Sequence, residues 1–162
     1  MKIAIVTGAS SGMGREFVTQ LESYISVDEI WVIARRRAAL EALNGLTKAT
    51  LRPIPLDLCE KESFETLSAL LEAEKPVVKL LVNAAGCGKF GAWDKVSVED
   101  DLKMIDLNCK ALVAMTRLVL PYMGANSHVL QLDSLSAFQP VPYINTYAAT
   151  KSFVLSYTRG LN

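Results

Sequence analysis

A tyrosine and a lysine stand four residues apart in the segment YAATK, and residues of these types at this spacing can perform acid–base chemistry. In a helix, Tyr147 and Lys151 would lie one turn apart on the same face. A free phenol has a pKa of about 10, which is too high for efficient proton transfer near neutral pH. An ammonium group beside a phenol stabilises the phenolate and lowers that pKa. The pair can therefore protonate a carbonyl oxygen as a hydride arrives, or deprotonate an alcohol; an ordinary surface pair on a helix is the alternative.

Two other polar residues stand where they can join such a pair. Ser134, in LQLDSLSAF, ends a predicted strand and can hydrogen-bond the same substrate oxygen, because ligands collect at the carboxyl ends of parallel strands. Asn108 interrupts the apolar stretch MIDLNCK, where an amide is usually a core residue with satisfied hydrogen bonds. The occurrence of all these residues in order, rather than any one of them, favours a catalytic site made of Asn108, Ser134, Tyr147 and Lys151.

A parallel sheet is needed to bring these side chains together, and the sequence predicts one. Short apolar runs near 3–7, 30–34, 51–56, 79–83 and 128–133 alternate with helical patterns over about 13–26, 36–44, 60–74, 98–123 and from 145 to the end. This alternation predicts an α/β fold of the doubly wound type, with helices on both faces of the sheet. We find no linker or internal repeat, and we expect residues 1–162 to form a single domain.

Two prolines in the third predicted strand indicate the strand order. Pro53 and Pro55 lie two residues apart in LRPIPL, so their missing N–H groups fall on the same side of the strand. An edge strand tolerates this arrangement, whereas a central strand does not. The third strand lies at the edge in the order 3-2-1-4-5, which the prolines therefore support.

A glycine-rich turn follows the first predicted strand in VTGASSGMGRE. Gly8, Gly12 and Gly14 permit positive φ angles and close approach of the backbone to a bound group. The turn leads into a helix N-terminus, where free N–H groups and the helix dipole favour phosphate. A turn without a ligand is the alternative, but the position after the first strand of a βαβ unit favours a dinucleotide.

The end of the second strand indicates which dinucleotide. A carboxylate there would bind a ribose 2′-hydroxyl, whereas WVIARRRAAL has arginines, which suit a 2′-phosphate. We assign Arg35 and Arg36 to the 2′-phosphate and prefer NADP(H) to NAD(H), although arginine can also stack on adenine. For Arg37 we prefer a solvated position at the helix start. Asp57 can accept a hydrogen bond from the adenine amine or cap the helix that begins near Glu60.

Composition excludes several classes of function. The 162 residues are 51% hydrophobic, and 17 Lys and Arg balance 17 Asp and Glu, which argues against nucleic acid or an anionic membrane as the partner. The sequence has neither a signal peptide nor an apolar run of membrane-spanning length, so we expect a cytoplasmic protein. Three cysteines without metal-ligand spacing and a single histidine, His128, predict a reduced protein with no metal site.

These motifs together resemble the short-chain dehydrogenase/reductase family over the whole chain. TGASSGMG matches the family's TGxxxGxG turn, and NAAG matches its NNAG segment with Ala84 in place of the second asparagine. Asn108 falls on the family's catalytic asparagine, Ser134 lies 13 residues before Tyr147 as the family serine does, and YAATK is its YxxxK motif. Asp133 replaces the more usual Ser or Asn before the catalytic serine.

The resemblance implies a Rossmann fold and reversible hydride transfer between NAD(P)(H) and a carbonyl or alcohol. It implies that Tyr147 is the acid/base, that Lys151 tunes it and binds the nicotinamide ribose, that Ser134 orients the substrate and that Asn108 supports a water relay. Arginine after the second strand usually accompanies NADP(H) in this family. The implied cofactor contacts are Thr7, Gly8, Ser10, Ser11, Gly12, Met13, Gly14, Arg35, Arg36, Asp57, Leu58, Asn83, Ala84, Ala85, Gly86, Tyr147 and Lys151.

The sequence stops short of the usual family length, after the helix that carries Tyr147 and Lys151. The sixth and seventh strands, the segment that contacts the nicotinamide carboxamide and the substrate lid are missing, so we expect a truncated chain. The apolar segment LSAFQPVPYINT favours a hydrophobic ketone or alcohol as substrate. Family helices corresponding to 98–123 and 145–162 pair across dimers, so we expect a homodimer or larger homo-oligomer. The alternative function is an inactive dinucleotide-binding or oligomerisation fragment.

Overall fold

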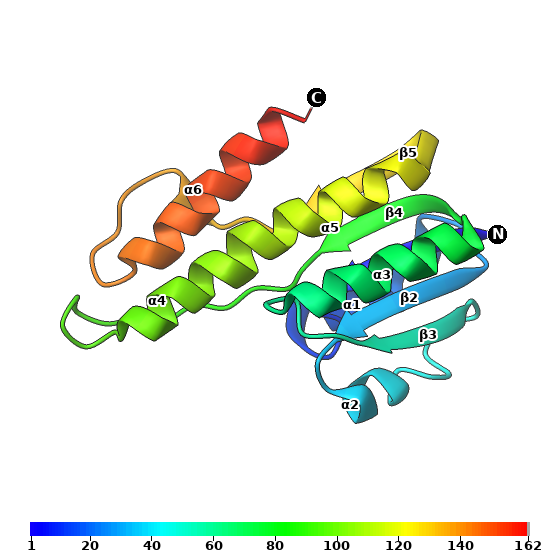
Figure 1. Ribbon diagram of the computed structural model, residues 1–162, viewed down its shortest axis with the longest axis horizontal. Coiled ribbons are helices and arrows are strands. Elements are labelled where there is room, and N and C mark those ends of the chain that lie inside the picture. The colour runs from blue at the N-terminus through cyan, green and yellow to red at the C-terminus, as the bar shows by residue number, and fades with distance from the viewer. Residues whose placement is uncertain (162) are drawn as a thin grey trace.

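The protein, described here by a computed structural model covering residues 1–161, is built on a five-stranded parallel sheet (Figure 1). The strands lie in the order β3-β2-β1-β4-β5, as the two prolines predict. Their bounds are β1 Lys2–Thr7, β2 Glu29–Ala34, β3 Thr50–Pro55, β4 Val77–Asn83 and β5 Met123–Gln131. This order and the parallel pairing confirm the predicted doubly wound fold.

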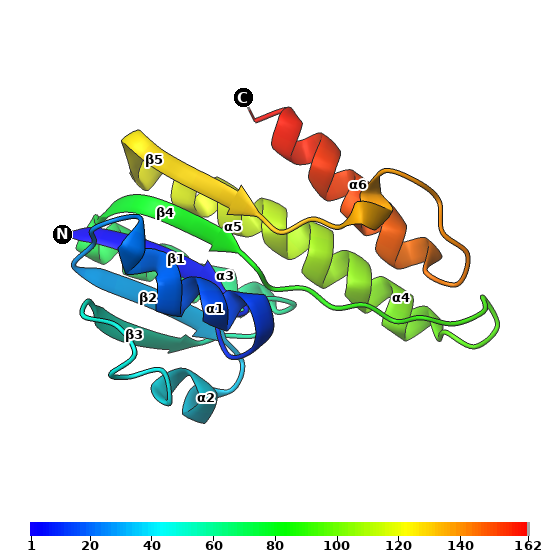
Figure 2. The same cartoon turned by 180° about the vertical axis from the view of Figure 1, so that it is seen from behind.

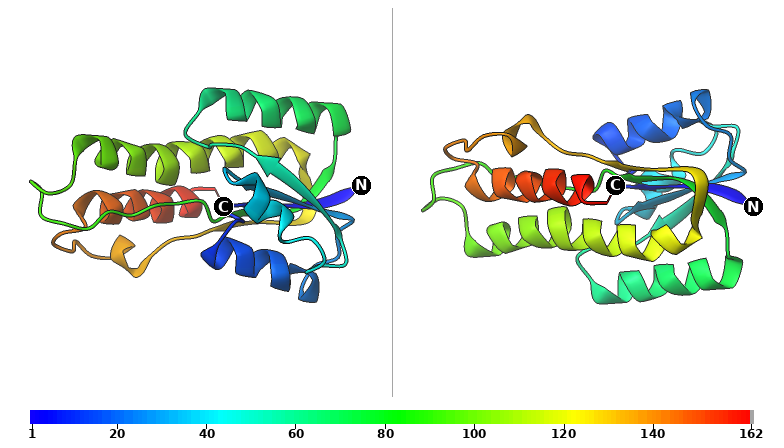
Figure 3. Two further views of the ribbon diagram at one scale, coloured as in Figure 1. Left: turned by 90° about the horizontal axis from the view of Figure 1, so that it is seen from below. Right: turned by 90° about the horizontal axis from the view of Figure 1, so that it is seen from above.

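Helices cover the sheet on both faces. The helical elements are α1 Gly12–Gln20, η1 Leu21–Ser23, α2 Arg37–Glu41, α3 Lys61–Glu74, α4 Val98–Ile105, η2 Asp106–Lys110, α5 Ala111–Val119, η3 Leu120–Tyr122, η4 Leu135–Ala137 and α6 Asn145–Arg159. Helices α3 and α5 lie on one face, and α1 lies on the other (Figures 1 and 2). The views in Figure 3 show α6 alongside the α4–α5 rod. Within residues 1–161, no helix combines the length and apolar character needed to cross a membrane.

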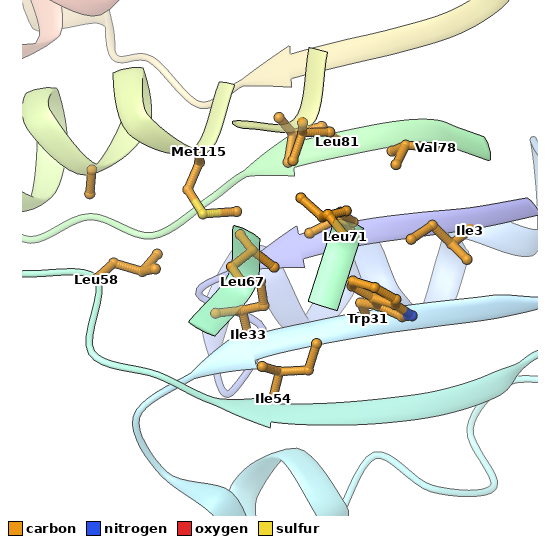
Figure 4. Packing of buried hydrophobic residues seen from close by; sticks show 13 residues of the cluster. Ile3, Trp31, Ile33, Ile54, Leu58, Leu67, Leu71, Val78, Leu81 and Met115 are labelled. Atoms are coloured by element: carbon orange, nitrogen blue, oxygen red, sulfur yellow. The ribbon is translucent and has the colours of Figure 1, made fainter. Parts of the chain in front are cut away.

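The central strands are apolar at successive positions because both of their faces are buried. Trp31 and Ile33 point from β2 towards α3, where they meet Leu67 and Leu71, and Met115 of α5 completes this layer (Figure 4). The intervening strand residues pack towards α1 and α2 in a second cluster. Two-sided burial explains why these strands read as continuous apolar runs.

The prolines of β3 face the open edge of the sheet. The N–H groups of Thr50 and Leu56 donate to the carbonyls of Asp28 and Ala34, so the backbone N–H groups of even-numbered residues in β3 point towards β2. Odd-numbered positions, including Pro53 and Pro55, therefore turn their nitrogens away from the ladder. Neither proline removes a hydrogen bond from the sheet, which is why this edge accepts them.

The fifth strand differs from its predicted extent of 128–133. It begins at Met123, which pairs with Val78, and the next pair joins Leu80 to His128, so residues 124–127 bulge out of the ladder. Asn126 takes a positive φ of 59° within this bulge. Regular pairing does start at His128, as the alternation indicates, but the strand ends at Gln131, two residues before the predicted end.

The predicted helix 98–123 is four successive segments rather than one α-helix. Residues Asp106–Lys110 form a π-helical turn between α4 and α5, and η3 ends the rod at Tyr122. The predicted helices 13–26 and 36–44 are also shorter, since α1 gives way to the 3-10 turn η1 and α2 spans only Arg37–Glu41. The π-helical turn carries Asn108, and this position agrees with the tendency of such turns to occur at functional sites.

The layer between α3 and the sheet makes a quantitative prediction about stability. Leu71 is fully buried, so Leu71→Ala should lower the free energy of unfolding by about 2–5 kcal/mol through lost burial and a residual cavity. Leu46→Ala is the matched control: Leu46 is 45% exposed, and we expect a loss of about 0.5 kcal/mol. Urea unfolding monitored by circular dichroism measures both values, and equal losses would contradict the assigned core.

Candidate active site

A cleft of about 380 Å³ opens at the carboxyl ends of the strands and contains most of the predicted cofactor contacts. It is lined by Gly8, Ser10, Ser11, Gly12, Met13, Gly14, Ile33, Ala34, Arg35, Arg36, Leu56, Asp57, Leu58, Cys59, Ala84, Ala85, Gly86, Lys103 and Leu107. Residues from four strand ends and from two helices thus meet around one elongated space.

The glycine turn is shaped to leave space for a ligand. Gly8 and Gly12 have φ angles of 66° and 53°, which side-chain-bearing residues rarely adopt. A Cβ at Gly8 would lie 2.8 Å from the backbone of Ala84, and one at Gly14 would collide with Gly8, so these glycines allow close packing. A Cβ at Gly12 would meet nothing within 4 Å, so this position borders open space. No side chain caps the start of α1, so its first N–H groups remain available for a phosphate.

The arginines after β2 line the cleft as predicted. Arg36 Nη2 donates to Ser10 Oγ over 3.5 Å, so this guanidinium reaches the glycine turn. Arg35 lies 4.0 Å from the carboxylate of Asp57, which joins the ends of β2 and β3. Arg37 instead forms an ion pair with Glu41 on the surface of α2, in agreement with the solvated position preferred for it.

Asp57 does not cap the helix that follows β3. Its Oδ1 accepts a hydrogen bond from the Cys59 N–H over 3.0 Å, and the residue at the N-cap of α3 is Glu60. The side chain therefore stabilises the turn before the helix. The carboxylate still borders the cleft, so the predicted contact with an adenine amine remains open to it.

Two predicted contacts, Thr7 and Asn83, lie behind the cleft wall. Thr7 Oγ1 accepts hydrogen bonds from the N–H groups of Ala84 and Ala85, each over 3.1 Å, and thereby shapes the loop after β4. Asn83 is buried, and its Nδ2 donates to Thr116 Oγ1 and Gln131 Oε1. Both residues support the wall from inside the protein instead of lining the cleft.

Lys151 lies beside the Tyr147 ring. Its Nζ donates to the carbonyl of Leu132 over 2.8 Å and lies 5.8 Å from the centroid of the phenol ring. A Cβ at Gly86, a cleft residue, would lie 3.9 Å from Lys151 Nζ, so the ammonium borders the loop that lines the cleft. The lysine side chain is 7% exposed. Tyr147 and Lys151 therefore share one face of α6, as the spacing predicts.

Asn108 joins the π-helical turn to two neighbouring segments. Its Oδ1 accepts from the Cys87 N–H, and its Nδ2 donates to the Cys87 carbonyl and to Thr150 Oγ1, with distances of 2.9, 2.9 and 3.0 Å. Thr150 in turn donates to the Tyr147 carbonyl over 2.7 Å. The asparagine is 1% exposed and fixes the loop after β4 against α6.

Ser134 lies beyond the strand that it was predicted to end. It is the N-cap of the short helix η4, and its Oγ accepts from the Ser136 N–H over 3.2 Å and the Ser136 hydroxyl over 2.9 Å. The Ser152 hydroxyl donates to the Ala137 carbonyl, so η4 is tied to α6. The strand ends at Gln131, but the Leu132 N–H still donates to the Asn83 carbonyl. The Leu132 carbonyl accepts from Lys151, which the sequence alone does not show.

Burial governs the electrostatics around this ammonium. It lowers the pKa of Lys151, and the negative charge of Asp133 partly opposes that shift. Burial also raises the pKa of the Cys87 and Cys109 thiols, which flank Asn108 and Lys151, so both thiols are neutral at pH 7. Asp133, to which the sequence assigned no role, is therefore the carboxylate whose charge acts most strongly on Lys151.

Sequence reasoning missed Lys103, Leu107 and Phe90. Lys103 and Leu107 lie one turn apart on the rod that carries Asn108, and this spacing could have identified them as neighbours of the cleft. Phe90 lies in the loop after β4, and its ring meets the Tyr147 ring edge-on with centroids 5.9 Å apart. No spacing rule links that loop to α6, so this contact was not predictable.

The family model and the related proteins that match this chain indicate the same family. The family model described as short chain dehydrogenase matches residues 2–162. An Escherichia coli protein named NADP-dependent 3-hydroxy acid dehydrogenase YdfG is 35% identical over 98% of this chain and 64% of its own length. The chain thus spans slightly less than two thirds of the length of this relative.

Solved structures agree with this result. Serine dehydrogenase in its closed form with NADP+ is 35% identical with a TM-score of 0.83, and 98% of this chain covers 64% of that one. A bulky-bulky ketone specific alcohol dehydrogenase from Comamonas testosteroni is 26% identical with a TM-score of 0.87, and the match covers 100% of this chain and 65% of that one. A short-chain dehydrogenase from Sphingobium yanoikuyae in complex with NADPH gives the same TM-score at 26% identity, covering 100% of this chain and 65% of that one.

The lowered pKa of Lys151 predicts how stability depends on pH. Between the lowered pKa and the ordinary value of 10.5, the unfolded chain binds more protons than the folded chain, so this residue's contribution to stability rises with pH. Lys151→Met cannot titrate. The melting temperature of the wild type minus that of Lys151→Met should therefore increase from about pH 7 to about pH 10, as measured by scanning calorimetry. A difference that stays flat or falls would contradict the assigned electrostatics.

Proposed function

We propose, since the chain belongs to the short-chain dehydrogenase family, that it interconverts a carbonyl and an alcohol with NADP(H). The bound dinucleotide supplies or accepts the hydride. The observation that carries the proposal is the placement of Lys151, whose buried ammonium lies beside the Tyr147 ring and borders Gly86 of the cleft. Tyr147 and Lys151 do not line the cleft themselves, but they place a phenol and an ammonium beside its wall at Gly86.

Tyr147 acts as the proton donor and acceptor for the substrate oxygen. The Lys151 ammonium stabilises negative charge on the phenol oxygen, and the Leu132 carbonyl fixes its position through a 2.8 Å hydrogen bond. Lys151 would also bind the nicotinamide ribose of the cofactor. Low exposure strengthens both effects, since little water screens the charge.

Asn108 and Ser134 complete the catalytic set in this proposal. Asn108 fixes the loop at Cys87 and the start of α6, and we assign it a supporting role in a water relay for the proton. Ser134 orients the substrate oxygen. Its hydroxyl accepts two hydrogen bonds within η4, so its own proton is free to be donated to the substrate.

Two arginines support NADP(H) over NAD(H). Arg35 and Arg36 follow β2 and line the cleft, where a guanidinium matches the geometry of a phosphate. The Arg36 hydrogen bond to Ser10 holds one of them beside the glycine turn. Asp57 lies 4.0 Å from Arg35, which limits its repulsion of a 2′-phosphate.

A hydrophobic ketone or alcohol is the substrate class that we propose. Phe90 is 68% exposed next to Tyr147, and Phe138 and Tyr143 are also exposed in the segment that follows Ser134. The N–H of Gly91 donates to the Tyr143 carbonyl over 2.8 Å, so the loop after β4 and this segment form one rim. Large apolar side chains that remain exposed together favour an apolar ligand.

A second candidate is a dinucleotide-binding or oligomerisation fragment without catalysis. An apolar groove of about 910 Å³ between α1 and strands β4 and β5 is lined by residues such as Phe17, Tyr24 and Leu130, and the described chain leaves it open. Leu102 and Ile105 of α4 and Phe153 of α6 are also exposed, and they suit a homodimer interface. These surfaces favour association, whatever the activity of the chain.

Cofactor preference can be measured by fluorescence titration with NADPH and NADH. We expect NADPH to bind more tightly, and Arg36→Leu to weaken NADPH by about tenfold with a smaller effect on NADH, because a charge-assisted hydrogen bond to phosphate is lost. Arg37→Leu is the matched control, since Arg37 pairs with Glu41 outside the cleft. Tighter binding of NADH by the wild type would contradict the assignment of the arginines.

Tyr147→Phe tests the proton-transfer role. Loss of the hydroxyl should lower kcat for ketone reduction by about 10²–10⁴-fold and change NADPH affinity by less than about tenfold. Tyr122→Phe, at the opposite end of the sheet from the cleft, should keep the wild-type rate. An active wild type whose rate survives Tyr147→Phe would refute the mechanism, whereas NADPH binding without activity in the wild type would favour the second candidate.

A further inference from the structure

Lys103 brings a third positive charge to the cleft from a different element than the arginines. It lies on α4, one turn before Leu107, and both residues line the cleft with Arg35 and Arg36. Burial raises the pKa of the Cys87 thiol, and the positive charges of Lys103 and Arg35 oppose that rise. Both cations therefore act on the same loop after β4, although they come from separate elements.

The ion pairs around α4 leave the Lys103 charge available. Of its acidic neighbours one turn away, Asp100 and Asp106 form ion pairs with Lys89 at 3.7 Å and with Lys110 at 3.3 Å, whereas Glu99 is in none of the ion pairs among residues 1–161. Among residues 1–161, Lys103 itself has no carboxylate within 4 Å. The other two cleft cations are engaged, Arg35 with Asp57 and Arg36 with Ser10. A cation without a counter-ion at a cleft wall is suited to a bound anion.

The position of α4 indicates which end of a dinucleotide Lys103 would face. Leu107, one turn after Lys103, packs against the core cluster that contains Ile33 of β2 and Leu58 after β3. The adenosine half binds at these strand ends in the proposed function. The pyrophosphate instead belongs to the glycine turn at the start of α1. Lys103 lines the same cleft as Arg35 and Arg36, which follow β2.

We propose that Lys103 is a specificity-determining residue that binds the 2′-phosphate of the adenosine half together with Arg35 and Arg36. This inference rests on the proposed NADP(H) function and adds a residue to it. A phosphate monoester carries a charge of about −1.5 to −2 at pH 7, whereas the ribose hydroxyl of NAD(H) carries none. The Lys103 charge therefore discriminates between the two dinucleotides, and its effect is screened by salt because the side chain is exposed.

Lys103→Met removes the charge and keeps most of the length of the side chain. We expect NADPH to bind about three- to tenfold more weakly and NADH to change by less than about twofold, because an exposed pair with a doubly charged partner is modest in strength. Lys110→Met is the matched control: it makes the same change in net charge, but Lys110 pairs with Asp106 and does not line the cleft. Lys103→Arg should retain the wild-type preference for NADPH.

The experiment is fluorescence titration of the four proteins with NADPH and NADH at two salt concentrations, with thermal melting to check folding. A loss of NADPH affinity in Lys103→Met that shrinks at high salt supports the inference. Equal losses for both dinucleotides would place Lys103 at the adenine or pyrophosphate and overturn the inference. An unchanged NADPH affinity in Lys103→Met would also overturn the inference. If the wild type binds neither dinucleotide, the proposed function fails and this inference fails with it, whereas wild-type binding with an unaffected variant refutes only the role of Lys103.

Discussion

The Lys151 ammonium is fixed where four separate segments of the chain meet. The Leu132 carbonyl after β5 accepts its hydrogen bond, the Tyr147 ring lies beside it on α6, and Gly86 of the loop after β4 borders it. Asn108 of the π-helical turn binds that loop through Cys87. A buried cation needs such surroundings, because its desolvation is costly unless polar groups compensate. These segments together surround one buried positive charge.

The same sheet edge combines two different electrostatic environments. Beside the glycine turn, exposed cations line the cleft, where they can attract an anion but are screened by salt. Beside Tyr147, one buried cation lies 5.8 Å from the centroid of the phenol ring, where little water screens it. Thr7 links the two ends, since its hydroxyl accepts from Ala84 and Ala85 in the loop that leads from the cleft to Gly86. One short loop thus borders both the cleft and the Lys151 ammonium.

The strand order, the glycine turn and the shared face of Tyr147 and Lys151 were predictable because each depends on local rules. Proline at an edge, glycine at positive φ and residues one helical turn apart need no knowledge of distant contacts. The π-helical turn at Asn108 and the early end of β5 were not predictable, because both lie where segments far apart in sequence meet, Asn108 with Cys87 and Thr150, and Leu132 with Lys151. Thr7 and Asn83 illustrate the same limit: the family resemblance implies cofactor contacts for both, but the structure places both side chains behind the cleft wall.

The electrostatic state of Lys151 is the central claim, and it can be measured directly. Lysine labelled with ¹⁵N at Nζ gives one NMR signal for each lysine side chain. The signal that is missing in Lys151→Met belongs to Lys151. Titration of this signal should give a pKa for Lys151 below its ordinary value of 10.5, because burial disfavours the charged form more than Asp133 stabilises it. A pKa at or above 10.5 would show that the ammonium is well solvated or strongly paired, and would contradict the buried site described here.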